Sequence, residues 1–450
     1  MHAEREAHQG GHGKLHRLVN GWWERLFSVI AGGSWDNQPQ LYESGQSRMD
    51  YLFNTLGSIC WGVLFPLLTV VATQFTGVEQ AGEFTLAFTT ASLLLYIGNY
   101  GVKTYQISDL SEIESFSSYR MQRFITCALM MVLGCFYCLL RGYDQHMWLI
   151  SMGCYGFRAV DALADVYEAR LQQIDKLYLA GISTAVRSIA GVAAFTLLLL
   201  FTRSLEVASI AMAIGALASL FLLTVPLTIL EAPRSRKGSF VEVREIFVEC
   251  FHSFIVIFLF NLIQNVPKYA MEGTLSYDSQ IYFSALAFPA QSMLMIVGFI
   301  YRPQLLRIAT IWSDPHKRVR FDFIILVMIG VCVLVTLGGL AYAKWLAVPL
   351  NGFMYSTDFE PYRKAQYLIM IAGGFAAAID FLYQILTVLR EQAIVTRAYV
   401  AATVLVAILS VVLVRVYGFD GSVYAFLAVM AVLFVALVAS YVIVRMRNKQ

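Results

Sequence analysis

The stretch GSVYAFLAVMAVLFVALVASYVIV, residues 421–444, contains no charged side chain. A helix of roughly 20 apolar residues is long enough to cross the hydrocarbon core of a bilayer. Other charge-free runs of comparable length lie at 51–78, 207–230, 279–301 and 323–343. Weaker apolar segments, each interrupted by single charges, bring the predicted number of transmembrane helices to twelve. The chain is therefore predicted to be an all-α, polytopic membrane protein.

The overall composition agrees with this fold class. Hydrophobic residues make up 58% of the chain and charged residues only 14%, against about 25% charged residues in soluble domains. The net charge of +3 gives no indication of a nucleic-acid partner. The seven cysteines lie in or beside apolar runs and are expected to be small interior residues. We expect no metal and no cofactor beyond a coupling proton or sodium ion.

The Lys and Arg residues predict how the chain is oriented. With twelve spans both termini lie on one side, and most Lys and Arg residues fall in the terminal segments and connections of that side. The positive-inside rule then places both termini in the cytoplasm, and the protein in the cytoplasmic membrane as a multi-pass chain.

A basic connection divides the predicted spans into two equal groups. EAPRSRKGSF, residues 231–240, follows the sixth span, so residues 49–230 and 245–450 are predicted to form two six-helix bundles joined by a basic linker at 231–244. Paired bundles around a central cavity are typical of transporters. Residues 1–48 are predicted to be a cytoplasmic segment, either an amphipathic helix on the membrane surface or a partly disordered tail.

The fourth predicted span carries an unusual charged face. In RAVDALADVYEAR, residues 158–170, helical spacing puts Arg158, Asp161, Asp165 and Glu168 on one side, and Arg187 lies at a similar depth in the fifth span. A charge at the bilayer centre costs roughly 2.5–3.5 kcal/mol, so these groups should face the protein interior. Either they form salt bridges, Arg158 with Asp161 or Arg187 with Asp165, or they line a polar cavity. An apparent excess of carboxylates favours the cavity.

Three further charged residues lie in predicted spans. Asp380 is predicted at a depth similar to Asp161, paired either with a group from another helix or with Gln384. Lys268 and Glu272 lie near the outer end of the seventh span, where extension of the charged tips toward water is the default expectation.

Two segments resemble a known family. They are RAVDALADVYEARLQQIDKLYLAGISTAVR, residues 158–187, with Tyr167, Gln172 and Ser183 between the charges, and NVPKYAMEGTLSYDSQIYFSALAFPAQ, residues 265–291. Both resemble the polysaccharide (oligosaccharide-lipid) flippase family of the multidrug/oligosaccharidyl-lipid/polysaccharide exporter superfamily. The chain departs from the pattern with Lys268 where Arg is common, Asp161 where Glu is common, and the long segment 1–48.

The resemblance implies a flippase that moves a polyprenyl-diphosphate-linked oligosaccharide across the bacterial cytoplasmic membrane by alternating access, for assembly of cell-surface polysaccharide. Its partners would be the lipid-linked oligosaccharide, membrane lipids, and polysaccharide polymerase or ligase proteins. Three cations are expected to bind the diphosphate, because guanidinium and ammonium groups bind phosphate oxygens: Arg158, Arg187 and Lys268. Four carboxylates are expected to line the cavity or couple ions: Asp161, Asp165, Glu168 and Asp380.

Several alternatives remain at the level of sequence. A multidrug or cation antiporter of the same superfamily is the nearest, because carboxylates suit a cationic ligand. A peptidoglycan-precursor flippase would more typically have fourteen spans, and a purely structural scaffold also remains. A membrane-embedded glycosyl- or acyltransferase is disfavoured, because the sequence contains neither a DxD nor an HxxxD motif. We therefore do not expect an enzyme.

Overall fold

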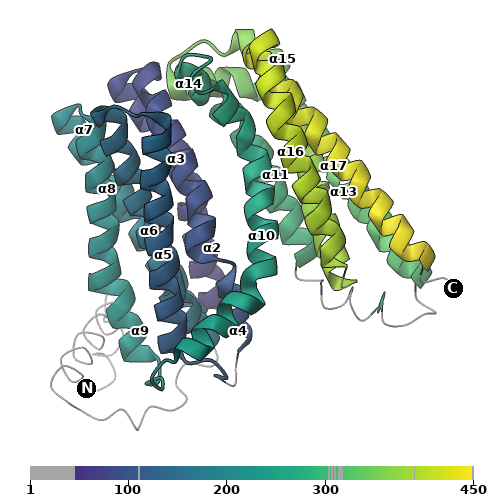
Figure 1. Ribbon diagram of the computed structural model, residues 1–450. Coiled ribbons are helices and arrows are strands. Elements are labelled where there is room, and N and C mark those ends of the chain that lie inside the picture. The colour runs from purple at the N-terminus through teal and green to yellow at the C-terminus, as the bar shows by residue number, and fades with distance from the viewer. Residues whose placement is uncertain are drawn as a thin grey trace, which may run out of the picture.

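The computed structural model describes residues 46–109, 112–302, 305, 308, 311–312, 318–389 and 391–447. These residues form long helices that run roughly side by side (Figure 1). The amphipathic helix predicted within residues 1–48 lies almost entirely outside the described part of the chain.

Six predicted spans of the first half are present as helical segments. Their bounds are α2 Gln46–Thr76, α3 Val78–Asn99, α4 Val102–Ser108, α5 Phe116–Arg141, α6 Gln145–Gln173, α7 Leu177–Thr202, α8 Leu205–Ser219 and α9 Val225–Glu231. The short α4 follows α3 in the same span. Helix α8 continues through a π-helical turn, Leu220–Thr224, into α9.

The six predicted spans of the second half are also present as helical segments. Its helices are α10 Phe240–Met271, α11 Asp278–Tyr301, α13 Arg318–Tyr342, which continues through Ala343–Ala347 into α14 Val348–Tyr355, then the single turn Glu360–Tyr362 leading into α15 Arg363–Val388, α16 Gln392–Tyr417 and α17 Phe419–Arg447.

Among the described residues, eleven helices are long and apolar enough to cross a membrane. The twelfth is α6, whose 29 residues are sufficient in length but carry the charged face noted in the sequence. The prediction of an all-α, twelve-span protein is confirmed.

Local sequence signals explain where several helices begin and end. Ser115, Asp144 and Ser239 precede α5, α6 and α10, and each side chain accepts a hydrogen bond from a backbone N–H of the first turn. Gly142 ends α5 with φ 65°, a conformation that glycine adopts without strain. Pro267 lies inside α10, which nevertheless continues to Met271.

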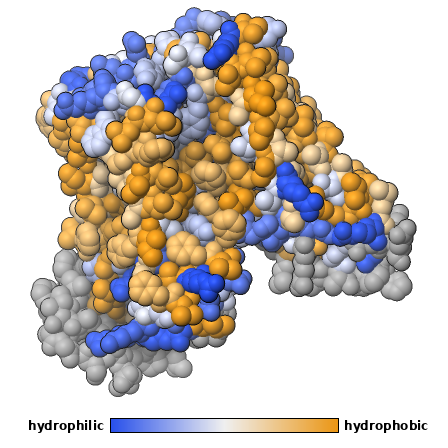
Figure 2. Space-filling model, in the orientation of Figure 1, coloured by the Kyte–Doolittle hydropathy of each residue, from blue (hydrophilic) through white to orange (hydrophobic). Residues whose placement is uncertain are grey.

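The helices are arranged as two bundles joined through α10. Helices α2–α9 pack on one another, and α11–α17 form the second group. Helix α10 contacts α5 and α3 of the first bundle and α16 and α17 of the second. We call the side of residues 232–239 the linker side. Figure 2 shows the surface hollowed between the two bundles on the linker side.

On the opposite side the two bundles meet closely. Helices α3 and α11 pack there so tightly that a Cβ atom added to Gly82 would lie 2.0 Å from the carbonyl oxygen of Tyr277. The side-chain amide of Gln74 donates hydrogen bonds to the carbonyl of Met354 and the hydroxyl of Ser356, both at 2.8 Å. The space between the bundles is therefore open on the linker side and closed on the other.

Candidate functional site

The charged face of α6 forms a buried network with α7. Arg158 Nη1 donates to Asp161 Oδ2 at 2.7 Å, and Arg187 Nε donates to Asp161 Oδ1 at 2.7 Å. Arg187 Nη1 also donates to Glu168 Oε1 at 2.5 Å, and Ser183 Oγ donates to the same oxygen at 2.9 Å. All four charged residues are at most 5% exposed. Two cations and two carboxylates therefore neutralise each other inside the first bundle.

The sequence predicted two alternative salt bridges, and the structure contains one of them. Arg158 pairs with Asp161, as the first alternative predicted. Arg187 does not pair with Asp165 but bridges Asp161 and Glu168. The Nε of Arg158 is buried without a hydrogen-bond partner, so this guanidinium is only partly engaged.

Asp165 is neutralised from two other helices. Lys103 Nζ of α4 lies 2.9 Å from Asp165 Oδ1, and Arg123 Nη2 of α5 lies 3.1 Å from Asp165 Oδ2. The side chain of Arg123 is fully buried and also donates to the carbonyl of Gly98 at 3.0 Å. The carboxylate excess expected from the sequence was wrong, because α4 and α5 supply cations that lie far from α6 in the chain.

Lys268 lies where the two bundles meet. It projects from α10, is 3% exposed, and its Nζ donates to Thr89 Oγ1 of α3 at 3.3 Å. It forms no salt bridge with any described residue, but its Nζ lies 5.6 Å from the ring centroid of Phe65. The expectation that this side chain extends toward water was wrong, because α2 and α3 of the first bundle cover it.

A pair of aromatic rings connects Lys268 to Arg158. Phe65 stacks on Phe88 with their ring centroids 5.1 Å apart, and the Cζ of Arg158 lies 4.5 Å from the centroid of Phe88. Aromatic faces attract cations and can hold them in a partly dehydrated site. Two predicted diphosphate ligands thus contact neighbouring rings of the first bundle, and Lys268 reaches them from α10.

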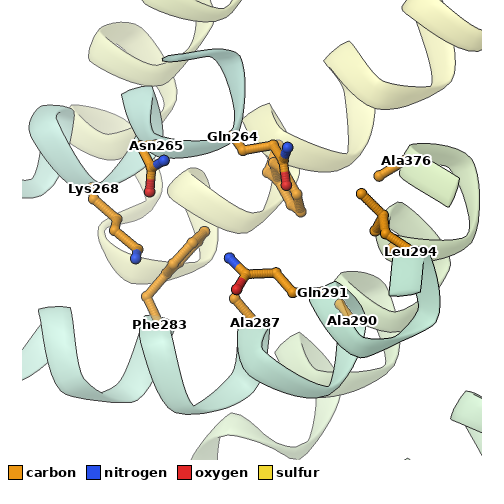
Figure 3. A pocket seen from close by; sticks show the side chains of 11 residues that line it. Gln264, Asn265, Lys268, Phe283, Ala287, Ala290, Gln291, Leu294 and Ala376 are labelled. Atoms are coloured by element: carbon orange, nitrogen blue, oxygen red, sulfur yellow. The ribbon is translucent and has the colours of Figure 1, made fainter. Parts of the chain in front are cut away.

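Lys268 also lines a small pocket in the second bundle. Polar side chains from α10 and α11 enter this pocket, including Gln264 and Gln291 (Figure 3). Small residues of α11 and α15, such as Ala287 and Ala376, form apolar walls.

Asp380 lies apart from the charges of α6. Tyr301 of α11 donates to Asp380 Oδ2 at 2.7 Å, and Arg302 Nη2 lies 3.4 Å from the same oxygen. The partner therefore comes from another helix, the first of the two alternatives drawn from the sequence. Asp380 and Asp165 are the more accessible carboxylates of the predicted set, at 15% and 14% side-chain exposure.

Comparisons with solved structures reveal the same fold in known transporters. An inward-facing multidrug resistance MATE family transporter of the MOP superfamily is 11% identical, with a TM-score of 0.62 over 86% of this chain and 94% of that chain. Lipid II flippase MurJ, in an inward closed conformation, is 14% identical with a TM-score of 0.65 over 87% of each chain. A MOP superfamily transporter from Pyrococcus furiosus is 10% identical with a TM-score of 0.52, over 89% of this chain and 93% of that one.

The chain shares its fold with these solved structures. Comparisons with protein-family models and with curated proteins find no match. At these identities the likeness covers the architecture, and the proteins that share it are transporters and flippases.

The fold also brings together a second group, which the sequence did not indicate, on the closed side of the interface. Glu272, at the end of α10 and 8% exposed, accepts hydrogen bonds from Tyr137 at 2.8 Å, Tyr143 at 2.7 Å and Arg141 Nε at 2.9 Å. Burial, followed by the nearby Tyr137 and Glu272, raises the pKa of Tyr143, so its phenol keeps the proton that it donates.

This group of Glu272, Tyr137, Arg141 and Tyr143 is called the Glu272 latch below. It joins α10 to the end of α5, and therefore ties the two bundles together on the closed side. Glu272 was expected to extend toward water, which is wrong because three donors from α5 and the turn after it enclose the carboxylate. The available signal was the spacing of Tyr137 and Arg141, four residues apart at the end of one helix.

Proposed function

We propose that this protein is a flippase that carries a polyprenyl-diphosphate-linked oligosaccharide across the cytoplasmic membrane by alternating access, for assembly of cell-surface polysaccharide. The supporting observation is Lys268, a buried cation with no carboxylate partner in the described chain, at the interface of the two bundles. A buried charge without a counter-charge is costly unless a ligand neutralises it. A diphosphate would do so.

The charge balance around α6 supports an anionic head group. Cations outnumber carboxylates there, because Lys103, Arg123, Arg158 and Arg187 face Asp161, Asp165 and Glu168. Lys268 adds a further positive charge across the interface. A cationic drug would meet net repulsion at this site, which disfavours the multidrug or cation antiporter alternative.

We assign different roles to the three cations expected at the diphosphate. Lys268 and Arg158 lie against the stacked rings of Phe65 and Phe88 and would bind the phosphate oxygens. Arg187 binds Asp161 through Nε and Glu168 through Nη1. It would therefore neutralise those carboxylates and reduce their repulsion of the substrate.

The open linker side fits the entry half of a transport cycle. If both termini lie in the cytoplasm, the hollow faces the side where lipid-linked oligosaccharides are assembled, and the Glu272 latch closes the exit. Breaking the latch while closing the linker side would carry the head group across.

A coupling proton or sodium ion would act at an accessible carboxylate. Asp165 and Asp380 meet this condition better than Asp161 and Glu168, whose side chains are 5% and 4% exposed. Asp380→Asn should remove the pH or sodium dependence of transport without abolishing substrate binding. If the pH or sodium dependence is unchanged in both Asp380→Asn and Asp165→Asn, neither carboxylate binds a coupling ion.

The deciding experiment uses purified protein in proteoliposomes. Vesicles would carry an undecaprenyl-diphosphate-linked oligosaccharide, and a membrane-impermeant glycosidase would report how fast the glycan reaches the other leaflet. Transport that exceeds that of protein-free vesicles supports the flippase. Efflux of a cationic dye without movement of the glycan would support the antiporter instead. Cellular deletion followed by analysis of glycans on each leaflet would test the assignment in vivo.

A further inference from the structure

A groove lies on the outside of the first bundle, where residues 232–239 pass the start of α5. Its volume is about 360 Å³, within the range of roughly 300–1,000 Å³ that is typical of small-ligand sites. Its lining residues are Ser117, Arg120, Met121, Phe124, Ile125 and Gly238. The five that belong to α5 recur at three- and four-residue spacing, so they share one face of the helix.

The wall of the groove opposite α5 is held by backbone contacts. A Cβ atom added to Gly238 would lie 3.0 Å from the backbone nitrogen of Ser118, and the backbone N–H of Ser239 donates to Ser118 Oγ at 3.0 Å. The backbone N–H of Phe116 donates to Ser235 Oγ at 2.8 Å. The connection between the bundles is therefore fixed on the first turn of α5, and both walls of the groove are held in place.

The groove changes from polar to apolar along α5. Arg120 lies in the part nearer the linker side, and Phe124 and Ile125, which are 57% and 43% exposed, lie about one turn further along. Helix α5 has 26 residues and a length of about 39 Å, which exceeds the ~30 Å hydrocarbon core of a bilayer. Its first residues therefore reach the lipid head groups, whereas Phe124 and Ile125 lie among the acyl chains.

The surface beyond the groove is suited to lipid contact. Residues 124–140 of α5 include no charged side chain. Figure 2 shows a broad apolar surface on the first bundle that gives way to hydrophilic side chains on the linker side. The groove thus opens toward acyl chains at one end and toward head groups at the other.

The polar end of the groove carries uncompensated positive charge. Arg120 is exposed and forms neither a salt bridge nor a hydrogen bond with any described residue. Lys237, which precedes Gly238, is also exposed and has no ion pair within the described chain. The carboxylate of Glu242, at the start of α10, is already engaged, because Arg236 Nη2 lies 2.9 Å from its Oε1.

We propose that this groove binds an anionic phospholipid from the leaflet on the linker side. Arg120 would hold the head-group phosphate through two parallel hydrogen bonds, with the hydroxyl of Ser117 beside it. An acyl chain would lie along Met121, Phe124 and Ile125. Such a lipid would join α5 to the connection between the bundles, and it would be bound whatever the protein transports.

The two ends of the groove together select this occupant. Lys and Arg residues beside a transmembrane helix attract anionic lipids. A zwitterionic phospholipid brings a cation along with its phosphate, and Arg120 and Lys237 would repel that cation. A free anion or a soluble protein could reach Arg120, but neither would gain from Phe124 and Ile125 at the depth of the acyl chains.

The test titrates phosphatidylglycerol or phosphatidylcholine onto the purified full chain in detergent and counts bound lipids by native mass spectrometry. The wild type should prefer phosphatidylglycerol. Arg120→Gln should lower the affinity for phosphatidylglycerol roughly tenfold, because hydrogen bonds to charged groups are strong, and leave that for phosphatidylcholine unchanged. Met121→Trp should also lower it, because the larger side chain fills the groove while every charge remains.

Arg397→Gln and Val132→Trp are the matched controls. Arg397 is an exposed arginine in the second turn of α16, also on the linker side but outside the groove. Val132 is 64% exposed on α5, about two turns beyond the groove. Both variants should bind phosphatidylglycerol as the wild type does.

Two results of the titration would overturn the proposal: equal affinity of the wild type and Arg120→Gln for phosphatidylglycerol, or no preference of the wild type for that lipid. Displacement of the lipid by equimolar inorganic phosphate would overturn it too, because the apolar end would then contribute nothing. A photo-crosslinking residue at Ser117 in the full chain identifies the occupant. An adduct with the mass of a phospholipid supports the site, whereas an adduct with residues 1–45 or with a second copy of the chain overturns it.

Discussion

Lys268 of α10 donates a hydrogen bond across the bundle interface to the hydroxyl of Thr89 on α3, at 3.3 Å. The two bundles therefore meet at a cation, and the contact is to a neutral hydroxyl rather than to a carboxylate. A neutral partner holds the ammonium in place but leaves its charge uncompensated. An arriving phosphate can consequently gain the full interaction, whereas a carboxylate partner would have to be displaced.

The first prediction concerns this uncompensated charge. Lys268→Gln should weaken binding of a lipid diphosphate roughly tenfold to a hundredfold, because hydrogen bonds to charged groups contribute about 1.5–3 kcal/mol. Lys268→Arg should retain most of the affinity. Binding in nanodiscs measures both, with Lys344→Gln as a control that removes an exposed lysine near Trp345. Wild-type affinity in Lys268→Gln would mean that the lysine only supports the interface.

The second prediction concerns the neutral network of α6 and α7. Arg187→Met should destabilise the protein by about 3–5 kcal/mol, because it leaves Asp161 and Glu168 buried with a single remaining cation. The thermal unfolding midpoint in detergent should fall accordingly. Adding Glu168→Gln should recover part of the loss, since the uncompensated charge is then removed.

Arg363→Met is the matched control for that series. Arg363 pairs with Glu360 in an exposed i,i+3 ion pair, so its loss should change the unfolding midpoint little. If Arg187→Met and Arg363→Met lower the midpoint equally, the α6–α7 network does not stabilise the fold. A stable Arg187→Met variant that no longer transports would point instead to direct substrate contact.

The fold could be predicted because membrane burial acts on each span separately. Charge-free runs such as 421–444 can be identified as membrane spans from their composition alone. Helix α6 was recognised as a span because its charges share one helical face. The twelve spans therefore required no knowledge of how the helices pack.

The charge pairing could not be predicted in the same way. Asp165 finds its partners on α4 and α5, and Glu272 finds donors on α5, all far away in the sequence. Without the packing, Asp165 was counted as part of a carboxylate excess and Glu272 was expected at the water interface. Helical spacing identifies which side chains share a face, but it does not identify the face opposite them.

The third prediction concerns the Glu272 latch. Glu272→Gln removes the charge that Arg141, Tyr137 and Tyr143 solvate, and should weaken the closed side by about 1–3 kcal/mol. Spin labels at Gln80→Cys and Ser276→Cys, in a transport-competent background without the native cysteines, would report the separation of α3 and α11. A longer distance population should grow in Glu272→Gln.

The control for the latch is Glu360→Gln. Glu360 also pairs with an arginine, but that pair is exposed and lies within the second bundle. It should leave the label distances unchanged. Identical distance distributions in the wild type and Glu272→Gln would show that the latch does not decide which side is open.

The fourth prediction tests the closed side by steric means. Gly82→Ala places a Cβ atom 2.0 Å from the carbonyl oxygen of Tyr277, which belongs to the backbone and cannot rotate away. The start of α3 must therefore separate from α11, and the label distance between Gln80→Cys and Ser276→Cys should lengthen. Gly330→Ala, within α13, places a Cβ atom where no other atom lies within 4 Å. Both changes replace a helical glycine by alanine and share the same gain of about 1 kcal/mol in helix propensity, so only the contact differs.

Gly82→Ala should also slow transport. A protein that cannot close on the side of α3 and α11 should accumulate in the state open to that side, since a two-state equilibrium shifts away from the conformation that the clash penalises. Its flipping rate should fall well below that of Gly330→Ala, while the affinity for sugar-free undecaprenyl diphosphate stays measurable, because Lys268 and Arg158 are unchanged. Normal flipping with unchanged distances would show that close approach of these two helices is not required for the cycle.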